Sequence, residues 1–378
     1  MRERPGDQKS ATTAVMEQTL PKQRWLLIGL GVLMIGGLPN HVNASPAVDG
    51  VRNLSLANAS RGSSTGSSAV FINPAGLSFT QQFSIEPVYQ LDVSSNTHGI
   101  GLSISDSLNN PHVGLALSYV FMKGAPKIAY EHTSGQMQDL KLSHYGHEAS
   151  LVLSIAAIKN WLYLGIRPKY QYSSLRYYDD DKKGQQVAPR LNAFGLDASV
   201  ALDILGFVRL TAVGYNLTGK LHPWWTEEQP VRLENVGMQP DGIIDHKSLS
   251  RLSDYPLALS HGISIFPLRK PEFNLNFDGL YDFSSYKQDK FVRNRFGGSA
   301  EFIVGRFPLR AGGAWDGRGR GKTDDRSYLS GGTGYIHPAQ IGGLGVDIGV
   351  GVSQQIHGPK PWETVIGINI GMRMHPNL

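Results

Sequence analysis

The 378-residue chain contains no cysteine, which excludes a disulfide framework, a thiolate metal site and a cysteine nucleophile. After residue 45 it also lacks any run of the ~18 apolar residues that a transmembrane helix needs. Charged residues make up only 18% of the chain. The formal net charge is +5, of which residues after 44 carry about +3. These shortages exclude several enzyme classes and give no indication of nucleic-acid binding.

Glycine and tyrosine, in contrast, are plentiful. The sequence holds 44 Gly and 15 Tyr, while its hydrophobic content of 40% is ordinary for a soluble protein. Composition therefore does not by itself indicate a membrane protein. Tyrosine is enriched in strands and glycine marks bulges and close backbone approaches, so this balance favours an all-β architecture over a helical one.

The N-terminus carries a targeting pattern. Lys22 and Arg24 precede an apolar stretch at 25–38, and a small-residue cleavage pattern follows at 42–44. A basic region, a short apolar core and such a site are typical of a secretory signal peptide, which we place at 1–44. The apolar core is too short to span a bilayer comfortably, although an uncleaved anchor remains the alternative.

Strict alternation of apolar and polar residues dominates the chain from residue 82. In 271–283 the aromatic and aliphatic side chains fall on one face, and Asn and Asp on the other. The same pattern fits 194–204 and 344–353. It predicts fourteen strands, at 83–93, 97–106, 111–122, 147–158, 161–176, 191–204, 206–217, 256–266, 271–284, 294–304, 306–315, 326–336, 341–354 and 362–374.

The connections between these strands alternate in length. Those after even-numbered strands are short, and those after odd-numbered strands are long except at 94–96. Strands of about 10–14 residues with short and long connections on opposite rims are typical of outer-membrane barrels. We therefore predict an all-β, 14-stranded antiparallel transmembrane β-barrel. A soluble double sheet with one polar face is the alternative.

In a barrel of this kind the apolar phase faces lipid and the other phase faces the lumen. The polar lumen residues that we single out as candidates are Arg167, Lys169, Asp278, Arg306 and Arg310. Both signs of charge occur, so no strong ion selectivity is indicated. Aromatic residues expected in girdles at the strand ends are Tyr89, Tyr119, Tyr170, Tyr172, Phe283, Trp315, Tyr335 and Trp362.

A short motif precedes the first strand. In Asn73-Pro74-Ala75-Gly76-Leu77, Pro74 fixes its own φ and Gly76 can take a positive φ, which predicts a tight turn. The Gly- and Ser-rich stretch 52–77 that ends in this motif resembles the N-terminal signature of the FadL (long-chain fatty acid transporter) superfamily and of PorV-like barrels. Only this stretch matches closely in sequence.

The resemblance implies a 14-stranded barrel at 82–378 with a hatch, or plug, at 45–81. It also implies passive transport of small hydrophobic molecules, without a cofactor or catalysis, and an outer-membrane location after export. The expected partners are a hydrophobic ligand, outer-membrane lipid and lipopolysaccharide, and the barrel-assembly machinery. The alternative function is that of PorV-like relatives, which serve as scaffolds for secreted or surface-attached proteins.

The longest connection holds apolar residues in a segment that should otherwise be polar: Trp224, Trp225, Ile243 and Ile244. Two interpretations compete. These side chains form a groove that captures a hydrophobic ligand, or they pack the loop onto the barrel mouth or into the lipid interface.

Three other patterns indicate no chemistry. The loop 315–323 resembles a phosphate-binding loop but has Asp316 where the first glycine is required. Two lysines directly after Asp179–Asp181 argue against calcium binding. His144 and His147 lie three residues apart at the start of a strand and form no metal motif. We therefore predict neither a metal site nor a catalytic residue.

Overall fold

The computed structural model describes residues 48–124, 127–131, 137–178, 185–218, 257–283, 292–317, 325–337, 343–358 and 363–374. All of them belong to one compact unit that extends from Pro39 to Leu378. The predicted signal peptide at 1–44 lies outside the described residues, as do the loop residues Trp224, Trp225, Ile243 and Ile244 and the acidic run Asp179–Asp181.

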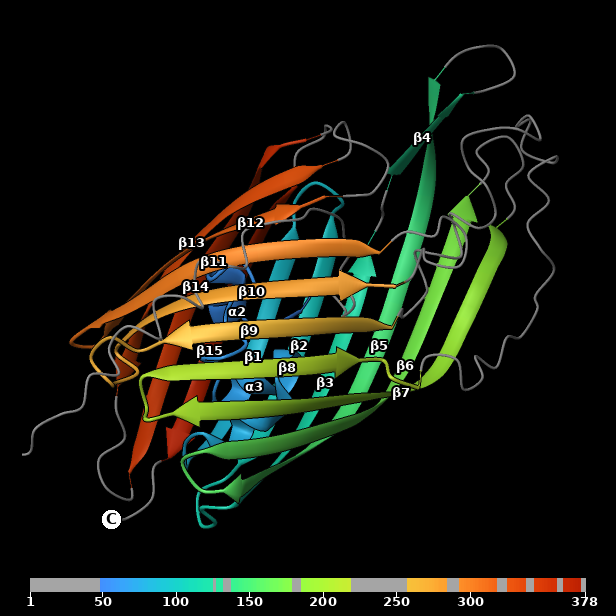
Figure 1. The fold of residues 1–378 in the computed structure, drawn as a ribbon. Helices are drawn as coiled ribbons and strands as arrows, with labels where there is room; N and C mark the ends of the chain where they lie inside the picture. Colours follow the sequence, from blue (N-terminus) through green and yellow to red (C-terminus); the bar gives the residue numbers. More distant parts are fainter. Residues whose placement is uncertain are drawn as a thin grey trace, which may run out of the picture. The chain divides into compact units, whose positions relative to one another are not determined.

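The strands account for most of this unit (Figure 1). Their bounds are β1 Phe83–Asp92, β2 Thr97–Asp106, β3 Val113–Gly124, β4 Lys127–Glu131, β5 Met137–Ile158, β6 Leu162–Tyr178, β7 Gln185–Ile204, β8 Val208–Tyr215, β9 Ala258–Ile265, β10 Phe273–Asp282, β11 Arg293–Val304, β12 Phe307–Asp316, β13 Arg326–His337, β14 Leu344–His357 and β15 Thr364–Met374.

The strands close into a ring. Each strand from β5 to β15 pairs with its sequence neighbours, β1 pairs with both β2 and β15, and β3 pairs with β2 and β5, always antiparallel. The short β4 pairs only with β5 and stands outside the ring. Fourteen strands therefore form a closed antiparallel barrel, and the predicted fold is confirmed. Closure leaves no sheet edge in the ring, as lipid requires of a spanning sheet.

The predicted phases of the strands also hold. Along β2 and β3 buried and exposed positions alternate, and the exposed ones carry large apolar side chains such as Leu115, Leu117 and Ile104. The opposite phase is polar and buried, with Ser103 and Ser118 as examples. The outer surface of the barrel is thus apolar and its interior polar, which is the arrangement suited to a lipid surround. Among the described residues, no helix is long and apolar enough to cross a membrane.

The predicted strand limits differ from the observed ones mainly at two places. β5 begins at Met137 rather than 147, and β7 begins at Gln185 rather than 191. These extra stretches carry Gln, Asp, Lys and Arg without the sustained apolar phase on which the prediction relied. They lengthen the wall on the rim that carries the long connections, called here the long-loop rim. The opposite rim, with the short connections, is called the short-turn rim.

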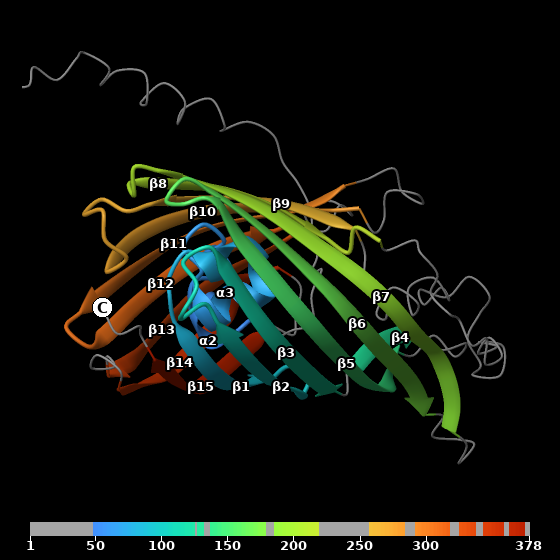
Figure 2. The same cartoon turned by 90° about the horizontal axis from the view of Figure 1, so that it is seen from below.

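Residues 48–82, called here the inner segment, lie inside the barrel (Figure 2). The inner segment contains α2 (Val51–Ser55), α3 (Gly66–Ile72) and the 3₁₀ helix η1 (Pro74–Ser78). α2 packs against β12 to β15, α3 against β1 to β3, and η1 against β3 and β5 to β7. The inner segment therefore contacts the wall on nearly all sides before the chain enters β1.

Wall glycines make this close packing possible. A Cβ atom at Gly165 of β6 would overlap the backbone of Pro74 and Ala75, and one at Gly312 of β12 would lie 2.7 Å from the carbonyl carbon of Leu56. Several of the 44 glycines are therefore used where the inner segment approaches the wall backbone, a role consistent with glycine in strands.

Gly165→Ala tests this packing. The added methyl group must displace η1, because backbone atoms cannot move away as a flexible side chain would, and we expect docking of the inner segment to weaken by about 1–3 kcal/mol. Limited proteolysis should then cleave the inner segment faster in folded, heat-modifiable barrels. Gly298→Ala is the matched control, since its Cβ would meet Phe277 at an ordinary 3.7 Å. Equal cleavage of both variants would contradict the packing argument.

Candidate functional site

The motif at 73–77 forms the contact between the inner segment and one side of the wall. The Ala75 N–H donates to Ser199 Oγ of β7 at 2.8 Å, and Ser154 Oγ of β5 donates to the Ala75 carbonyl at 3.0 Å. Ser78 Oγ donates in turn to Ser154 Oγ at 2.8 Å. The backbone polar groups of Ala75 would otherwise be buried without partners, so these serines stabilise η1 at this position.

Asn73 holds the motif to the rest of the inner segment. Its side chain is fully buried, and Nδ2 donates to the Arg61 carbonyl oxygen at 2.7 Å. Asn73 follows α3 directly and Pro74 opens η1. Proline is well tolerated there because the first turn of a helix does not need its N–H.

The sequence predicted a tight turn with Gly76 at positive φ, and this geometry is wrong. Residues 74–78 form a 3₁₀ helix, and Gly76 does not lie in the left-handed region. Glycine is needed because a Cβ at Gly76 would overlap the Ser64 carbonyl oxygen. Leu77 is fully buried beside Gly114 of β3. The motif is thus a packing unit rather than a reversal of the chain.

A charged contact joins α2 to the wall. Arg52 Nη2 lies 2.5 Å from Glu301 Oε2 of β11, and Arg310 Nε of β12 donates to Glu301 Oε1 at 2.7 Å. Asn274 Nδ2 donates to the same carboxylate at 3.0 Å. One buried carboxylate therefore receives two guanidinium groups and an amide, an arrangement that satisfies its charge away from bulk water.

A second charged contact lies deeper. Arg61 Nη1 and the Arg61 N–H both donate to Asp278 Oδ2 of β10, at 3.0 and 2.9 Å. Arg61 Nε donates to the Tyr215 hydroxyl at 2.9 Å, and that hydroxyl donates to the Ile72 carbonyl at 2.5 Å. Arg61 thereby connects α3, β8 and β10, and both charged groups are almost fully buried.

A third charged contact involves β6 and β7. Arg167 Nε donates to Asp197 Oδ2 at 2.7 Å, Lys169 Nζ lies 2.9 Å from Asp197 Oδ1, and all three side chains are buried. Arg167 Nη1 donates to the Val70 carbonyl at the end of α3 at 3.0 Å. Arg167 therefore holds the inner segment, while Lys169 shares the Asp197 carboxylate with it.

Four of the five candidate lumen residues, Arg167, Lys169, Asp278 and Arg310, project inward and are buried. Arg306 differs, because it lies in the exposed turn between β11 and β12, where Nη1 donates to the Tyr335 hydroxyl at 3.0 Å. The alternation of inward and outward side chains does not extend to Arg306, because residues 305 and 306 form a turn between two strands. His147 faces outward, and its Nδ1 contacts the Tyr119 hydroxyl. Within the described ranges, no group of three or more His, Asp or Glu is placed to bind a metal ion.

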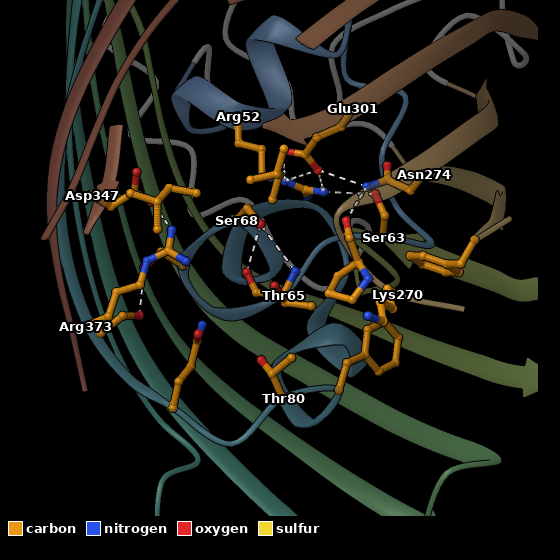
Figure 3. A pocket seen from close by; sticks show the side chains of 18 of the residues that line it. Arg52, Ser63, Thr65, Ser68, Thr80, Lys270, Asn274, Glu301, Asp347 and Arg373 are labelled. Carbon is orange, nitrogen blue, oxygen red and sulfur yellow. Dashed lines mark hydrogen bonds and ion pairs between the residues drawn. The ribbon is translucent and has the colours of Figure 1, made fainter. Parts of the chain in front are cut away.

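A cavity of about 380 Å³ lies at the short-turn rim between the inner segment and the wall (Figure 3). Six Lys or Arg residues and three carboxylates line it, so both signs of charge meet there with cations in excess. Labelled around it in Figure 3 are Arg52, Ser63, Thr65, Ser68, Thr80, Lys270, Asn274, Glu301, Asp347 and Arg373. The Arg52–Glu301 contact borders this cavity, and the Arg52 side chain keeps 18% of its surface exposed.

The sequence did not reveal Asp49, Arg52 or Arg61 as site residues. Asp49 begins the inner segment, its Oδ2 accepts from Asn58 Nδ2 at 3.0 Å, and its Oδ1 is buried without a partner. Burial raises the pKa of the Asp49 carboxyl from 3.8 to about 6, although the nearby Arg61 and Arg295 guanidiniums act to lower it. The only sequence signal for these three residues is that they are charged and lie within, or just before, a Gly- and Ser-rich stretch.

The raised pKa of Asp49 predicts a pH dependence. Between about pH 4 and 6 the docked inner segment binds more protons than the undocked one. Docking therefore strengthens as the pH falls through this window, and the gain is lost as the pH rises through about 6. We expect amide protection of α2 against hydrogen exchange, corrected for intrinsic rates, to be higher at pH 5 than at pH 7. Asp49→Asn should remove this difference. An unchanged difference in the variant would contradict the assignment to Asp49.

No protein-family model and no curated protein sequence matches the chain. Solved structures do match it. The crystal structure of a Pseudomonas aeruginosa FadL homologue gives a TM-score of 0.51 at 12% identity, covering 85% of this chain and 97% of that one. The Ralstonia pickettii toluene transporter TbuX gives 0.53 at 11% identity, covering 86% and 98%. The P. putida toluene transporter TodX gives 0.51 at 10% identity, covering 90% and 100%.

At these identities the likeness concerns the fold, and it extends over nearly the whole length of each neighbour. The ring of fourteen strands, its apolar exterior and its polar interior agree with that likeness. The chain therefore has the FadL-like fold, a 14-stranded antiparallel barrel of the outer-membrane type.

Proposed function

We propose that this chain is an outer-membrane channel through which small hydrophobic molecules diffuse passively, with residues 45–81 acting as its hatch. The observation that carries the proposal is the inner segment, which lies inside the barrel, packs against strands around the ring and borders a cavity on the short-turn side. A segment packed inside a barrel closes the direct path across it. Passage then requires the segment to shift, which makes it the natural gate.

The structural neighbours support this function by their described activities. They include toluene transporters and CymD, a monoaromatic hydrocarbon channel. Their activities are not catalytic, which agrees with the proposal of a channel rather than an enzyme. The PorV-like scaffold function finds no support among them.

Export and location belong to the same proposal. The pattern at 1–44 would direct the chain across the inner membrane, and the barrel-assembly machinery would insert it into the outer membrane. The short-turn rim would then face the periplasm, and the cavity in Figure 3 would be the exit. Outer-membrane lipid and lipopolysaccharide would surround the apolar exterior.

The Arg52–Glu301 contact is the anchor best placed to open. It borders the exit cavity and is partly exposed, whereas Arg61–Asp278 and Arg167–Asp197 are almost fully buried. Because a buried ion pair that loses one partner leaves an uncompensated charge, the deeper anchors are costly to break. The proposal therefore places the first movement at α2, with η1 remaining bound to β5 and β7.

Deletion of residues 46–77 tests the gating proposal. Proteoliposomes containing the wild-type chain should take up toluene faster than empty liposomes, and the deleted barrel should show higher ionic conductance because its lumen is no longer filled. Both quantities are measurable on the same preparation. Wild-type uptake equal to that of empty liposomes would contradict the channel, and unchanged uptake and conductance after the deletion would contradict the hatch.

Arg52→Gln tests the choice of anchor. Loss of the charge-assisted bonds to Glu301 should weaken docking of α2 by about 1.5–3 kcal/mol and raise the frequency of channel opening in planar bilayers. Arg306→Gln removes the same charge from the exposed β11–β12 turn and should leave opening unchanged. If the two variants open equally often, the Arg52–Glu301 contact is not the one that opens first.

A further inference from the structure

The outward face of β1, β2, β3 and β5 changes character in steps towards the long-loop rim. The strand register places the outward residues in cross-strand rows. One row, which on β1 and β2 lies at the third residue from the short-turn rim, is wholly aliphatic and consists of Ile85, Ile104, Leu117 and Leu151. The next row is mixed and consists of Pro87, Leu102, Tyr119 and Ala149.

Two further rows lie closer to the long-loop rim. The first consists of Tyr89, Ile100, Phe121 and His147. The second, called here the cationic row, consists of Leu91, His98, Lys123 and Tyr145. Over these four rows the outer surface passes from aliphatic through aromatic to cationic, which matches the passage from acyl chains to head groups in a lipid leaflet.

His98 and Lys123 are neighbours on this face. They lie directly opposite each other on β2 and β3, which places their Cβ atoms about 5 Å apart, and both side chains are exposed. Both point away from the lumen, because the adjacent positions Gly99 and Met122 face the interior. Two nitrogen-bearing side chains therefore reach the same level of the outer surface.

The histidines on this face share one hydrogen-bonding pattern. The Tyr89 hydroxyl bonds His98 Nδ1 at 2.7 Å, and the Tyr119 hydroxyl bonds His147 Nδ1. A tyrosine that occupies Nδ1 leaves Nε2 for another partner. Among the described side chains of the four rows there is no carboxylate, so Lys123 has no acidic neighbour within them.

The β1–β2 connection, which holds only residues 93–96, is too short to cover this region. The pairing of Lys123 with His98, above an apolar surface and with no acid among the described side chains of the four rows, is complementary to an anion that carries acyl chains.

We propose that the cationic row binds a phosphate group of lipid A, the phosphorylated glycolipid of the outer leaflet. Lys123 Nζ and His98 Nε2 donate to the phosphate oxygens, and the acyl chains lie along the aliphatic row. The assignment to this leaflet rests on the proposed outer-membrane orientation, in which the long-loop rim faces outward. The site is separate from the inner segment and the exit cavity, so it concerns the lipid surround and not the transported molecule.

The test is lipid binding by the full mature chain in detergent, followed by native mass spectrometry. Diphosphorylated lipid A should bind, and the double variant Lys123→Ala with His98→Ala should bind at least tenfold more weakly. Lys159→Ala is the matched control, because it removes an exposed lysine at the short-turn rim and should bind like wild type. Lys123→Arg should retain binding, since the cation is kept. Heat-modifiable migration confirms that each variant is folded.

Three outcomes would overturn the proposal. The first is that the double variant binds lipid A as tightly as the wild type does. The second is that the wild type binds dephosphorylated lipid A as tightly as diphosphorylated lipid A. The third is that the wild type binds phosphatidylglycerol as tightly as lipid A, which would contradict the assignment to the glycolipid. Toluene uptake by the double variant separates this proposal from the proposed function. Normal uptake with lost lipid binding supports the site, whereas absent uptake in wild type with lipid binding intact contradicts only the channel.

Discussion

The structure depends on one electrostatic constraint: charges buried inside a closed barrel must find partners there. Arg167, Asp278 and Glu301 all project from the wall into an interior that bulk water barely reaches. Leaving any of them unpaired would carry a large desolvation penalty. Wall residues pair with two of them, Asp197 with Arg167 and Arg310 with Glu301. The inner segment completes these sites with the Val70 carbonyl and Arg52, and it supplies Arg61 as the ion-pair partner of Asp278. Barrel and inner segment are therefore complementary in charge.

Close packing follows from the same constraint. Charge-assisted bonds of 2.5 to 3.0 Å require the inner segment to approach the wall, and side chains on every lumen position would prevent it. Glycines such as Gly165 and Gly312 remove that obstacle. The glycine content alone indicates only a strand-rich chain. In the structure, glycines such as Gly165 and Gly312 occur where the backbone of the inner segment passes close to the backbone of the wall. A cavity remains at the short-turn rim, where Arg52 is partly exposed.

The sequence predicts the wall far better than its contents. Alternation is a direct consequence of one face in lipid and one in a polar interior, so the strands and their phases follow from it, including the apolar rows at Leu117 and Leu151. It fails where the environment changes, as at Arg306 in a turn. The inner segment has no such period. The sequence predicts a turn at Gly76, because the contact with Ser64 that requires glycine there arises only from tertiary packing. The roles of Arg52 and Arg61 likewise depend on their partners Glu301 on β11 and Asp278 on β10, which lie far away in the sequence.

The absence of cysteine makes the central claim directly testable. Ser78 Oγ of η1 and Ser154 Oγ of β5 lie 2.8 Å apart, so Ser78→Cys with Ser154→Cys places a thiol pair across the contact between the inner segment and the wall. If the inner segment docks there, oxidation joins the two cysteines in intact outer membranes, and reductant releases them. Failure of this pair to cross-link, when folded barrels are present, would contradict the account.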